Sequence, residues 1–165
     1  MFLKITRDDI SPAIRRLVKL ARNPEPVMRA MGTTFKSITE GNFNSVGAAM
    51  RPSPWASKAD GSPSNLQRST TLSKSFRLDV SPTVARLSNP ARYAAIHQFG
   101  GEITAKRARM LSWIGPDGQR VFVRRVTIPA RPFFPVDATG SRLTRRAEEL
   151  ILRAGERMVQ RQTHG

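Results

Sequence analysis

The chain of 165 residues contains no cysteine, only two histidines and only one tyrosine. The lack of cysteine excludes disulfides, thiol catalysis and metal sites built on cysteine. No apolar run approaches the roughly 18 residues that a membrane-spanning helix needs. Lys4 and the acidic pair Asp8-Asp9 interrupt any signal-peptide core. These absences predict a soluble protein that is made in a cytoplasm.

Acidic residues are also scarce, since 12 Asp+Glu stand against 28 Lys+Arg and leave a formal net charge of +16. Such a charge attracts polyanions or acidic protein surfaces over long range. The excess is spread through the chain, and residues 104 to 131 carry 7 basic groups and 1 acidic group. Composition therefore predicts a negatively charged partner without identifying it.

The length and an apolar fraction of 39% fit one domain over residues 1–165 with a small core. Residues 45–68 show no sustained period and are rich in Gly, Pro and Ser. We expect a long loop there, either mobile or ordered by a partner. The alternative is that Trp55 folds back onto the chain's own core.

Three amphipathic helices are predicted by apolar residues at helical spacing. The first starts with Ser11 as N-cap and Pro12 at the first helical position, and it ends at Asn23-Pro24. Its apolar face consists of Ile14, Leu17, Val18 and Ala21. The second covers 25–43, with a face of Val27, Ala30, Met31, Phe35 and Ile38. The third covers 141–161, with a face of Leu143, Ala147, Leu150, Ile151, Ala154 and Met158.

Two hairpins and a short helix are predicted between the second and third of these helices. Alternation over 75–87, broken by Ser81-Pro82, predicts the first hairpin. Asn89-Pro90 predicts the start of a helix of about ten residues that Gly100-Gly101 ends. The turn at 115–118 predicts the second hairpin, in which a slip near Arg124 indicates a bulge or a strand exposed on both faces. The fold class is α+β, with antiparallel strands.

His97 is the first candidate for catalysis, but the sequence signals no orienting partner and no substrate nucleophile for it. A packed or hydrogen-bonded structural histidine is the favoured interpretation, four residues after Tyr93. A metal site would need His164 and scattered carboxylates without ligand spacing. We predict no catalytic, cofactor-binding or metal-binding residues; a hydrolase would depend on His97 or on a carboxylate.

Nucleic-acid binding is the stronger alternative, because several basic residues could meet phosphates. The candidates are Lys106, Arg107, Arg109, Arg124 and Arg125. A single-strand binder would interleave stacking rings with these cations. Phe99, Trp113 and Phe122 are instead spaced as core residues. The basic surface could equally meet solvent or acidic neighbours in an assembly.

Two motifs carry a resemblance to a known family: "YAAIHQFGG" at 93–101 and "IPARPFFPVD" at 128–137. With the helices that end near "TEGNF" and the closing amphipathic helix, the chain resembles the phage virion morphogenesis (tail completion) family of Mu-like phages. It departs from that family's commoner pattern at "RSTTLSKSF", where an Asp-Thr-Gly element often precedes the first strand.

The resemblance implies a structural, non-enzymatic virion protein without a cofactor, assembled in the host cytoplasm. It would act at the head-proximal end of the tail and join tail to head, beside neck and connector proteins and DNA in the channel. A ring with heterologous interfaces is implied, and tail symmetry makes it a hexamer. His97 and Phe99 would hold the base of a hairpin, and Arg131 the corner between strand and helix. The interface candidates are Tyr93, His97, Phe99, Gly100, Gly101, Arg131, Pro132 and Phe133.

Overall fold

The computed structural model describes residues 10–44, 50–58, 61–64, 66, 70–106, 109–115 and 117–164. Helices and antiparallel strand pairs confirm the α+β class. Contacts divide the chain into two compact units. The first comprises Met1–Ser37, Arg77–Ser88 and Arg145–Gly165, and the second comprises Ile38–Phe76 and Asn89–Thr144. A single domain over 1–165 stays a prediction.

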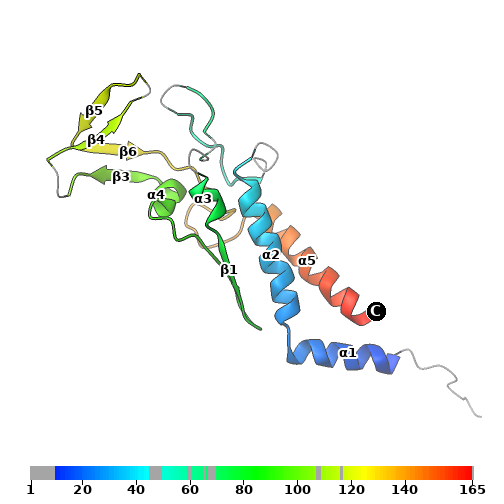
Figure 1. Cartoon of the computed structure of the whole chain (residues 1–165). Helices are drawn as coiled ribbons and strands as arrows, with labels where there is room; N and C mark the ends of the chain where they lie inside the picture. The colour runs from blue at the N-terminus through cyan, green and yellow to red at the C-terminus, as the bar shows by residue number, and fades with distance from the viewer. Residues whose placement is uncertain are drawn as a thin grey trace, which may run out of the picture. The chain divides into compact units, whose positions relative to one another are not determined.

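The first unit contains α1 (Ile10–Arg22), most of α2 (Glu25–Gly41), α5 (Arg145–His164) and the hairpin of β1 (Arg77–Val80) with β2 (Ala85–Ser88) (Figure 1). Gly155 of α5 lies against Met31 of α2, and Gly32 of α2 lies against Leu78 and Ala85 of the hairpin. The side chain of Arg16 in α1 donates a hydrogen bond to the carbonyl of Thr163 in α5. Helix α2 therefore contacts both α5 and the hairpin.

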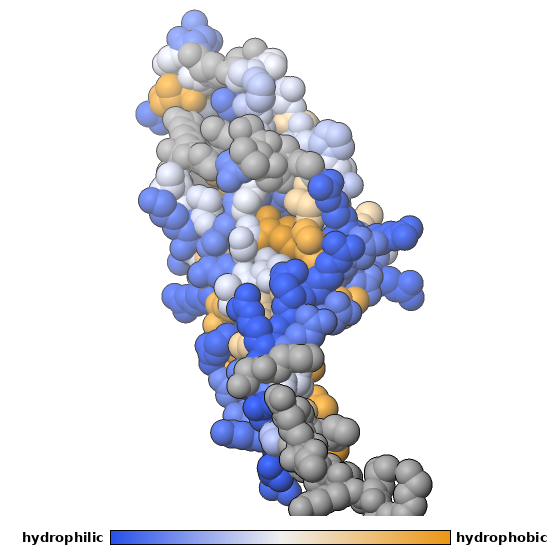
Figure 2. Space-filling model, turned by 90° about the vertical axis from the view of Figure 1, so that its right-hand side faces the viewer, coloured by the Kyte–Doolittle hydropathy of each residue, from blue (hydrophilic) through white to orange (hydrophobic). Residues whose placement is uncertain are grey.

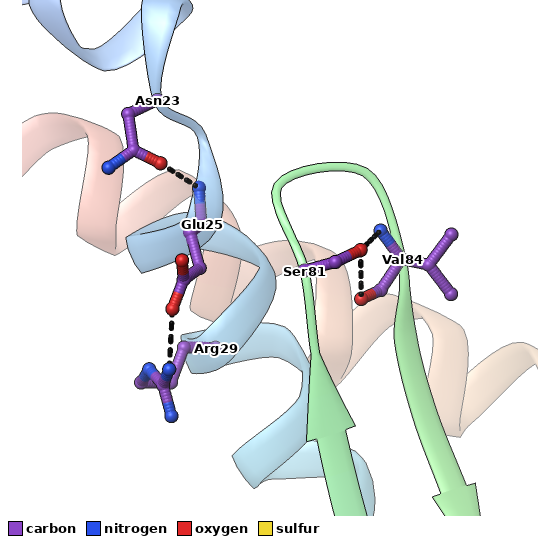
Figure 3. A network of polar contacts seen from close by, with 5 residues as sticks. All are labelled: Asn23, Glu25, Arg29, Ser81 and Val84. Atoms are coloured by element: carbon purple, nitrogen blue, oxygen red, sulfur yellow. Dashed lines mark hydrogen bonds and ion pairs between the residues drawn. The ribbon is translucent and has the colours of Figure 1, made fainter.

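The predicted end of α1 and start of α2 are confirmed. Asn23 follows α1, and its side-chain oxygen accepts a hydrogen bond from the backbone N–H of Glu25 at 3.4 Å. Glu25 forms an ion pair with Arg29 one turn later (Figure 3). The predicted start of α1 was wrong by a residue or more: the helix already includes Ile10, so Ser11 lies inside it and is not the N-cap.

The apolar face predicted for α1 is not buried. Ile14 is 53% exposed, and Leu17, Val18 and Ala21 are exposed as well. The less exposed residues of α1 lie on another side of the helix, where Ala13, Arg16 and Leu20 are half-buried. Periodicity found the apolar residues of α1, but the prediction that they are buried was wrong, since no described part of the chain covers them.

Hairpin β1–β2 is confirmed, with its turn at the predicted place. Leu78 lies opposite Leu87, and Val80 lies opposite Ala85. The side-chain oxygen of Ser81 accepts the backbone N–H of Val84 at 3.1 Å and closes the turn (Figure 3). Local alternation and the turn residues were therefore sufficient to predict this element.

The second unit contains α3 (Thr71–Lys74), α4 (Ala94–Phe99), β3 (Gly101–Thr104), β4 (Leu111–Ile114), β5 (Arg120–Val123) and β6 (Arg125–Ile128). The predicted second hairpin is β4–β5, and the predicted break in alternation falls at Arg124, between β5 and β6. Helix α3 and the pairing of β3 with β6 were not predicted. The two ladders, β3 with β6 and, nested within it in sequence, β4 with β5, lead away from α4 (Figure 1); they and the other described residues of 101–128 are here called the β-ribbon.

Helix α4 is shorter than the ten residues predicted for it. It begins at Ala94, whereas Asn89 caps a separate turn through the backbone N–H of Ala91 at 3.1 Å. The side-chain amide of Asn89 also donates to the carbonyl of Leu72 at 2.7 Å. Asn89 therefore holds a turn and the end of α3, and it does not start a helix.

Five aromatic rings form the core of the second unit and are called the aromatic cluster below. They are Phe43, Trp55, Phe76, Phe133 and Phe134. Phe133 is 0% exposed, and its ring centroid lies 5.5 Å from that of Phe43 and 5.8 Å from that of Phe76. Most of these pairs meet edge to face, the arrangement that ring quadrupoles favour, worth about 0.5–1.5 kcal/mol per pair beyond burial.

Candidate functional site

The two motifs of the resemblance meet inside the second unit. The side-chain oxygen of Gln98 accepts the backbone N–H groups of Phe133 and Phe134, each at 3.0 Å. The backbone N–H of Arg131 donates to the carbonyl of His97 at 2.6 Å. Helix α4 is thus hydrogen-bonded to the segment 131–134, which carries two rings of the aromatic cluster.

Gly100 and Gly101 make this approach sterically feasible. Both have a positive φ, of 70° and 140°. A Cβ on Gly100 would lie 2.8 Å from the backbone nitrogen of Ala130, closer than real Cβ atoms come. The backbone N–H of Gly100 also closes α4 by donating to the carbonyl of Ile96. The prediction that this glycine pair ends the helix is confirmed.

Arg131 holds a loop and not the corner that was predicted for it. Its buried guanidinium donates to the carbonyls of Ala56 and Ser57, both at 2.9 Å. The corner after the second motif is instead held by Asp137, whose carboxylate accepts from the hydroxyl of Thr139 at 2.7 Å and from the backbone N–H of Ser141. The hydrogen bond from Thr139 is the main reason why the pKa of Asp137 lies below its ordinary value.

The described part of the predicted loop is fixed on the core by Trp55. The indole N–H donates to the carbonyl of Pro132 at 2.8 Å, and the guanidinium of Arg51 lies 3.8 Å from the ring centroid. Arg51 also donates to the carbonyl of Asn42 at 2.7 Å, and burial lowers its pKa. The interpretation that Trp55 folds back onto the chain's own core is therefore confirmed.

His97 has the surroundings of a packed residue. Its ring meets Tyr93 edge to face at 5.7 Å, and its Nδ1 atom is buried without a hydrogen-bond partner in the described structure. Burial lowers the pKa of His97, and the nearby positive charge of Arg131 lowers it further. A neutral imidazole is thus favoured near pH 7, which agrees with the structural interpretation of this histidine.

Phe99 was predicted to be a core residue, but it is 59% exposed, and Tyr93 is exposed as well. The buried residues of α4 are Ala94 and Gln98. The short helix therefore turns its small and amide side chains inward, and the aromatic rings at its two ends lie at the surface.

The predicted basic contacts lie along the β-ribbon. Lys106, Arg109, Arg124 and Arg125 are exposed, and Arg107 lies outside the described residues. Arg125 forms an ion pair with Glu102 at 3.6 Å, and both side chains are exposed. Trp113 and Phe122 were predicted to be core residues and are exposed instead, at 40% and 58%. The β-ribbon therefore presents cations and apolar rings on the same surface element.

The described residues offer few groups that could form a metal-binding or catalytic site. No group of three or more His, Asp or Glu side chains in the described structure could hold a metal ion. An open pocket of about 470 Å³ in the first unit has Glu25 as its single acid, already paired with Arg29. None of the described helices has the length and apolar character needed to span a membrane.

The residues that the sequence interpretation missed are polar and buried. Gln98 stands inside the first motif, and Asn42 donates its side-chain amide to the carbonyl of Phe133 at 2.8 Å. Gln98 sits in a largely apolar stretch, which was the available signal, whereas Asn42 lies in the polar stretch TEGNFN and gave none. Each buried amide hydrogen-bonds a backbone group of a distant segment, so it marks a position where chain segments join.

Comparisons with known proteins identify the family of this sequence. The sequence profile of the phage virion morphogenesis family matches residues 5–153. The chain is 30% identical over 125 residues to Mu-like prophage FluMu G protein 2 of Haemophilus influenzae, covering 76% of this chain and 75% of that protein. No solved structure matches the chain. The chain therefore belongs to the phage virion morphogenesis family, and its role lies in the making of a phage virion.

Proposed function

We propose that the chain is a structural protein that completes the tail at its head-proximal end and joins the tail to the head. In this proposal the copies form a homo-oligomeric ring, a hexamer if it follows tail symmetry, and contact neck and connector proteins. Assembly takes place in the host cytoplasm, and the protein stays in the neck region of the virion. Its role there is architectural and not catalytic.

The observation that carries the proposal is the amount of apolar surface left uncovered on one chain of this family. Helix α1 exposes Ile14, Leu17 and Val18 as one face, and the β-ribbon exposes Trp113 and Phe122. Figure 2 shows apolar patches between hydrophilic side chains on one face of the molecule. Uncovered apolar groups of this kind mark surfaces that become buried in an assembly.

The geometry of the motifs supports an architectural role. Gln98, Arg131 and Trp55 use their polar atoms to hold backbone groups of other segments. Residues with this function fix the shape of a subunit, and their polar atoms are occupied by the fold itself. A ring requires such fixed shape, because each copy must present two different patches to its neighbours in the same geometry.

Electron microscopy of particles that lack this protein tests the proposal. We expect filled heads and separate tails, and joined particles should return when the protein is supplied from a plasmid. Purified protein should form a ring, measured by light scattering and by negative-stain microscopy. Normally joined heads and tails in the absence of the protein would contradict the proposal.

A second candidate function is that of a small basic nucleic-acid-binding protein, favoured by the exposed cations of the β-ribbon. Binding through phosphates weakens steeply as salt rises, because each neutralised phosphate releases counterions. Duplex binding by the purified protein that falls steeply between low and physiological salt, without a ring, would favour this candidate over the first.

A further inference from the structure

The β-ribbon stands without the support that a two-stranded sheet normally needs. Its ladders are β3 with β6 and β4 with β5, and no third strand among the described residues joins either of them. All residues of β3 are exposed, and so are three of the four residues of β4. Isolated two-stranded ribbons are marginally stable in water, so a further surface is expected to complete this one.

Both faces of the outer half of the β-ribbon carry exposed large apolar side chains. Trp113 lies opposite Val121, and Leu111 lies opposite Val123, so these four side chains share one apolar face. The opposite face is mixed: Phe122 lies opposite Ser112, and Ile114 lies opposite Arg120. Ile114 and Phe122 are nevertheless the two most exposed large apolar side chains of the β-ribbon. A strand pair that covers a core would keep its large apolar side chains on one face, whereas this pair exposes them on both.

Most charged side chains around these faces are basic. The described acids of the β-ribbon are Glu102 and Asp117, and Glu102 is paired with Arg125. The exposed cations of the β-ribbon are Lys106, Arg109, Arg120, Arg124 and Arg125. A second copy, with 28 basic residues against 12 acidic ones, offers poor charge complementarity. Carboxylates on a different protein would provide this charge complementarity.

We infer that the β-ribbon is a docking arm that inserts into an apolar cleft of a different virion protein, with carboxylates along the rim of that cleft. The inference rests on the proposed function, which supplies neighbouring virion proteins as partners. Large apolar side chains on both faces require two walls, so Trp113 contacts one wall and Phe122 the other. Arg120 lies beside Phe122 on the second face and Arg124 at the break between β5 and β6, so both can reach carboxylates at the rim. A duplex would contact the cations and leave Trp113, Ile114 and Phe122 in water, which makes it a poorer occupant.

The test uses heads and tails purified separately from a phage that lacks this protein, together with the full-length purified chain. Binding to each is measured by co-sedimentation, and joining is counted by electron microscopy. The variants are Trp113→Ser and Phe122→Ser, one on each face. Val84→Ser and Leu152→Ser are matched controls, because both side chains are about as exposed and lie outside the β-ribbon.

Each β-ribbon variant should bind heads or tails at least about tenfold more weakly than the wild type, as expected when an interface anchor is removed. The controls should bind like the wild type, and all variants should unfold at similar temperatures, since exposed positions contribute little to stability. The double variant Arg120→Glu, Arg124→Glu should also bind more weakly, whereas Arg120→Lys, Arg124→Lys should retain binding at low salt.

Other outcomes overturn the inference in distinct ways. If the wild type neither binds nor joins heads and tails, the proposed function fails, and the inference fails with it. If the wild type joins particles and both serine variants join them equally well, only the docking arm is wrong. If Trp113→Ser weakens binding and Phe122→Ser does not, the arm lies flat on a surface and no cleft encloses it.

Two further measurements exclude the remaining occupants. Light scattering gives the oligomeric state of each variant, and loss of a wild-type oligomer in both serine variants would assign the β-ribbon to contacts between copies. A short DNA duplex, titrated at physiological salt, serves as the second probe. Tight duplex binding that both serine variants lose would assign the β-ribbon to DNA. Either result would overturn docking to a different protein.

Discussion

The side-chain oxygen of Gln98 accepts a hydrogen bond from the backbone N–H of Phe133 at 3.0 Å, and both residues are buried. The same oxygen accepts the N–H of Phe134. One amide therefore satisfies two backbone donors that the aromatic cluster removes from water. It joins two segments that lie 35 positions apart in the chain.

Gln98→Leu should destabilise the protein markedly. The substitution keeps an apolar side chain of similar size but leaves two buried N–H groups without an acceptor. Since each unsatisfied donor costs about 1–3 kcal/mol, we expect a loss of about 2–4 kcal/mol in the free energy of unfolding, measured by denaturant titration. Gln119→Leu, at an exposed position, is the control. A loss no greater than that of the control would show that these hydrogen bonds are dispensable.

Arg131→Met should release the loop around Trp55. Without the hydrogen bonds to the carbonyls of Ala56 and Ser57, the adjacent Lys58 becomes easier for a protease to engage. We expect trypsin to cleave after Lys58 several-fold faster than in the wild type, as followed by mass spectrometry. Arg109→Met removes an exposed arginine elsewhere and should leave this rate unchanged. Equal rates in all three proteins would mean that Arg131 does not hold the loop.

Gly100→Ala and Gly118→Ala should separate steric clash from backbone strain. Both glycines have a similar positive φ, of 70° and 78°. A Cβ on Gly118 meets nothing within 4 Å, whereas one on Gly100 meets the backbone of Ala130. We expect Gly118→Ala to cost about 1 kcal/mol and Gly100→Ala clearly more, by thermal or chemical unfolding. Equal costs would indicate that the segment at Ala130 can move aside.

His97 should make stability dependent on pH on the acidic side of neutrality. Its folded pKa is lowered by burial and by Arg131, so the unfolded chain binds the proton first as pH falls below about 6.5. The free energy of unfolding should therefore decrease as pH falls from about 6.5 to the lowered folded pKa of His97. At still lower pH, His97 should cause no further change. His97→Gln should lack this component, so its stability profile should be flatter than that of the wild type, and the difference between the two proteins should change as pH falls through the window. Parallel pH profiles would contradict the assignment.

Local signals predicted much of the fold. The proline and asparagine between α1 and α2, the alternation of β1 and β2, and the glycines after α4 act over a few residues, and each was interpreted correctly. Strand β3 was missed because four residues, Gly101–Thr104, give no period, and their partner β6 begins only at Arg125. A short window of sequence does not include both strands, so it cannot indicate that β3 pairs with β6.

The candidate site was predicted in part. Gly100, His97 and Phe133 take structural positions in the second unit, as expected. The role of Arg131 was misplaced, because a cation between prolines does not reveal which carbonyls it will reach. Gln98 was overlooked, since a lone glutamine is an ordinary surface residue until the fold buries it.

The sequence by itself determined the class of the fold and most of its helices and turns, because periodicity, capping and turn chemistry are local properties of the chain; two motifs indicated the family by resemblance. Tertiary structure alone decided which apolar faces are covered. The same spacing of apolar residues buries Ala147, Ile151 and Ala154 on α5 but leaves Leu150 there and the predicted face of α1 exposed, and the β-ribbon keeps Trp113 and Phe122 in solvent. Burial depends on what other segments bring to a surface, and no stretch of sequence contains that information on its own.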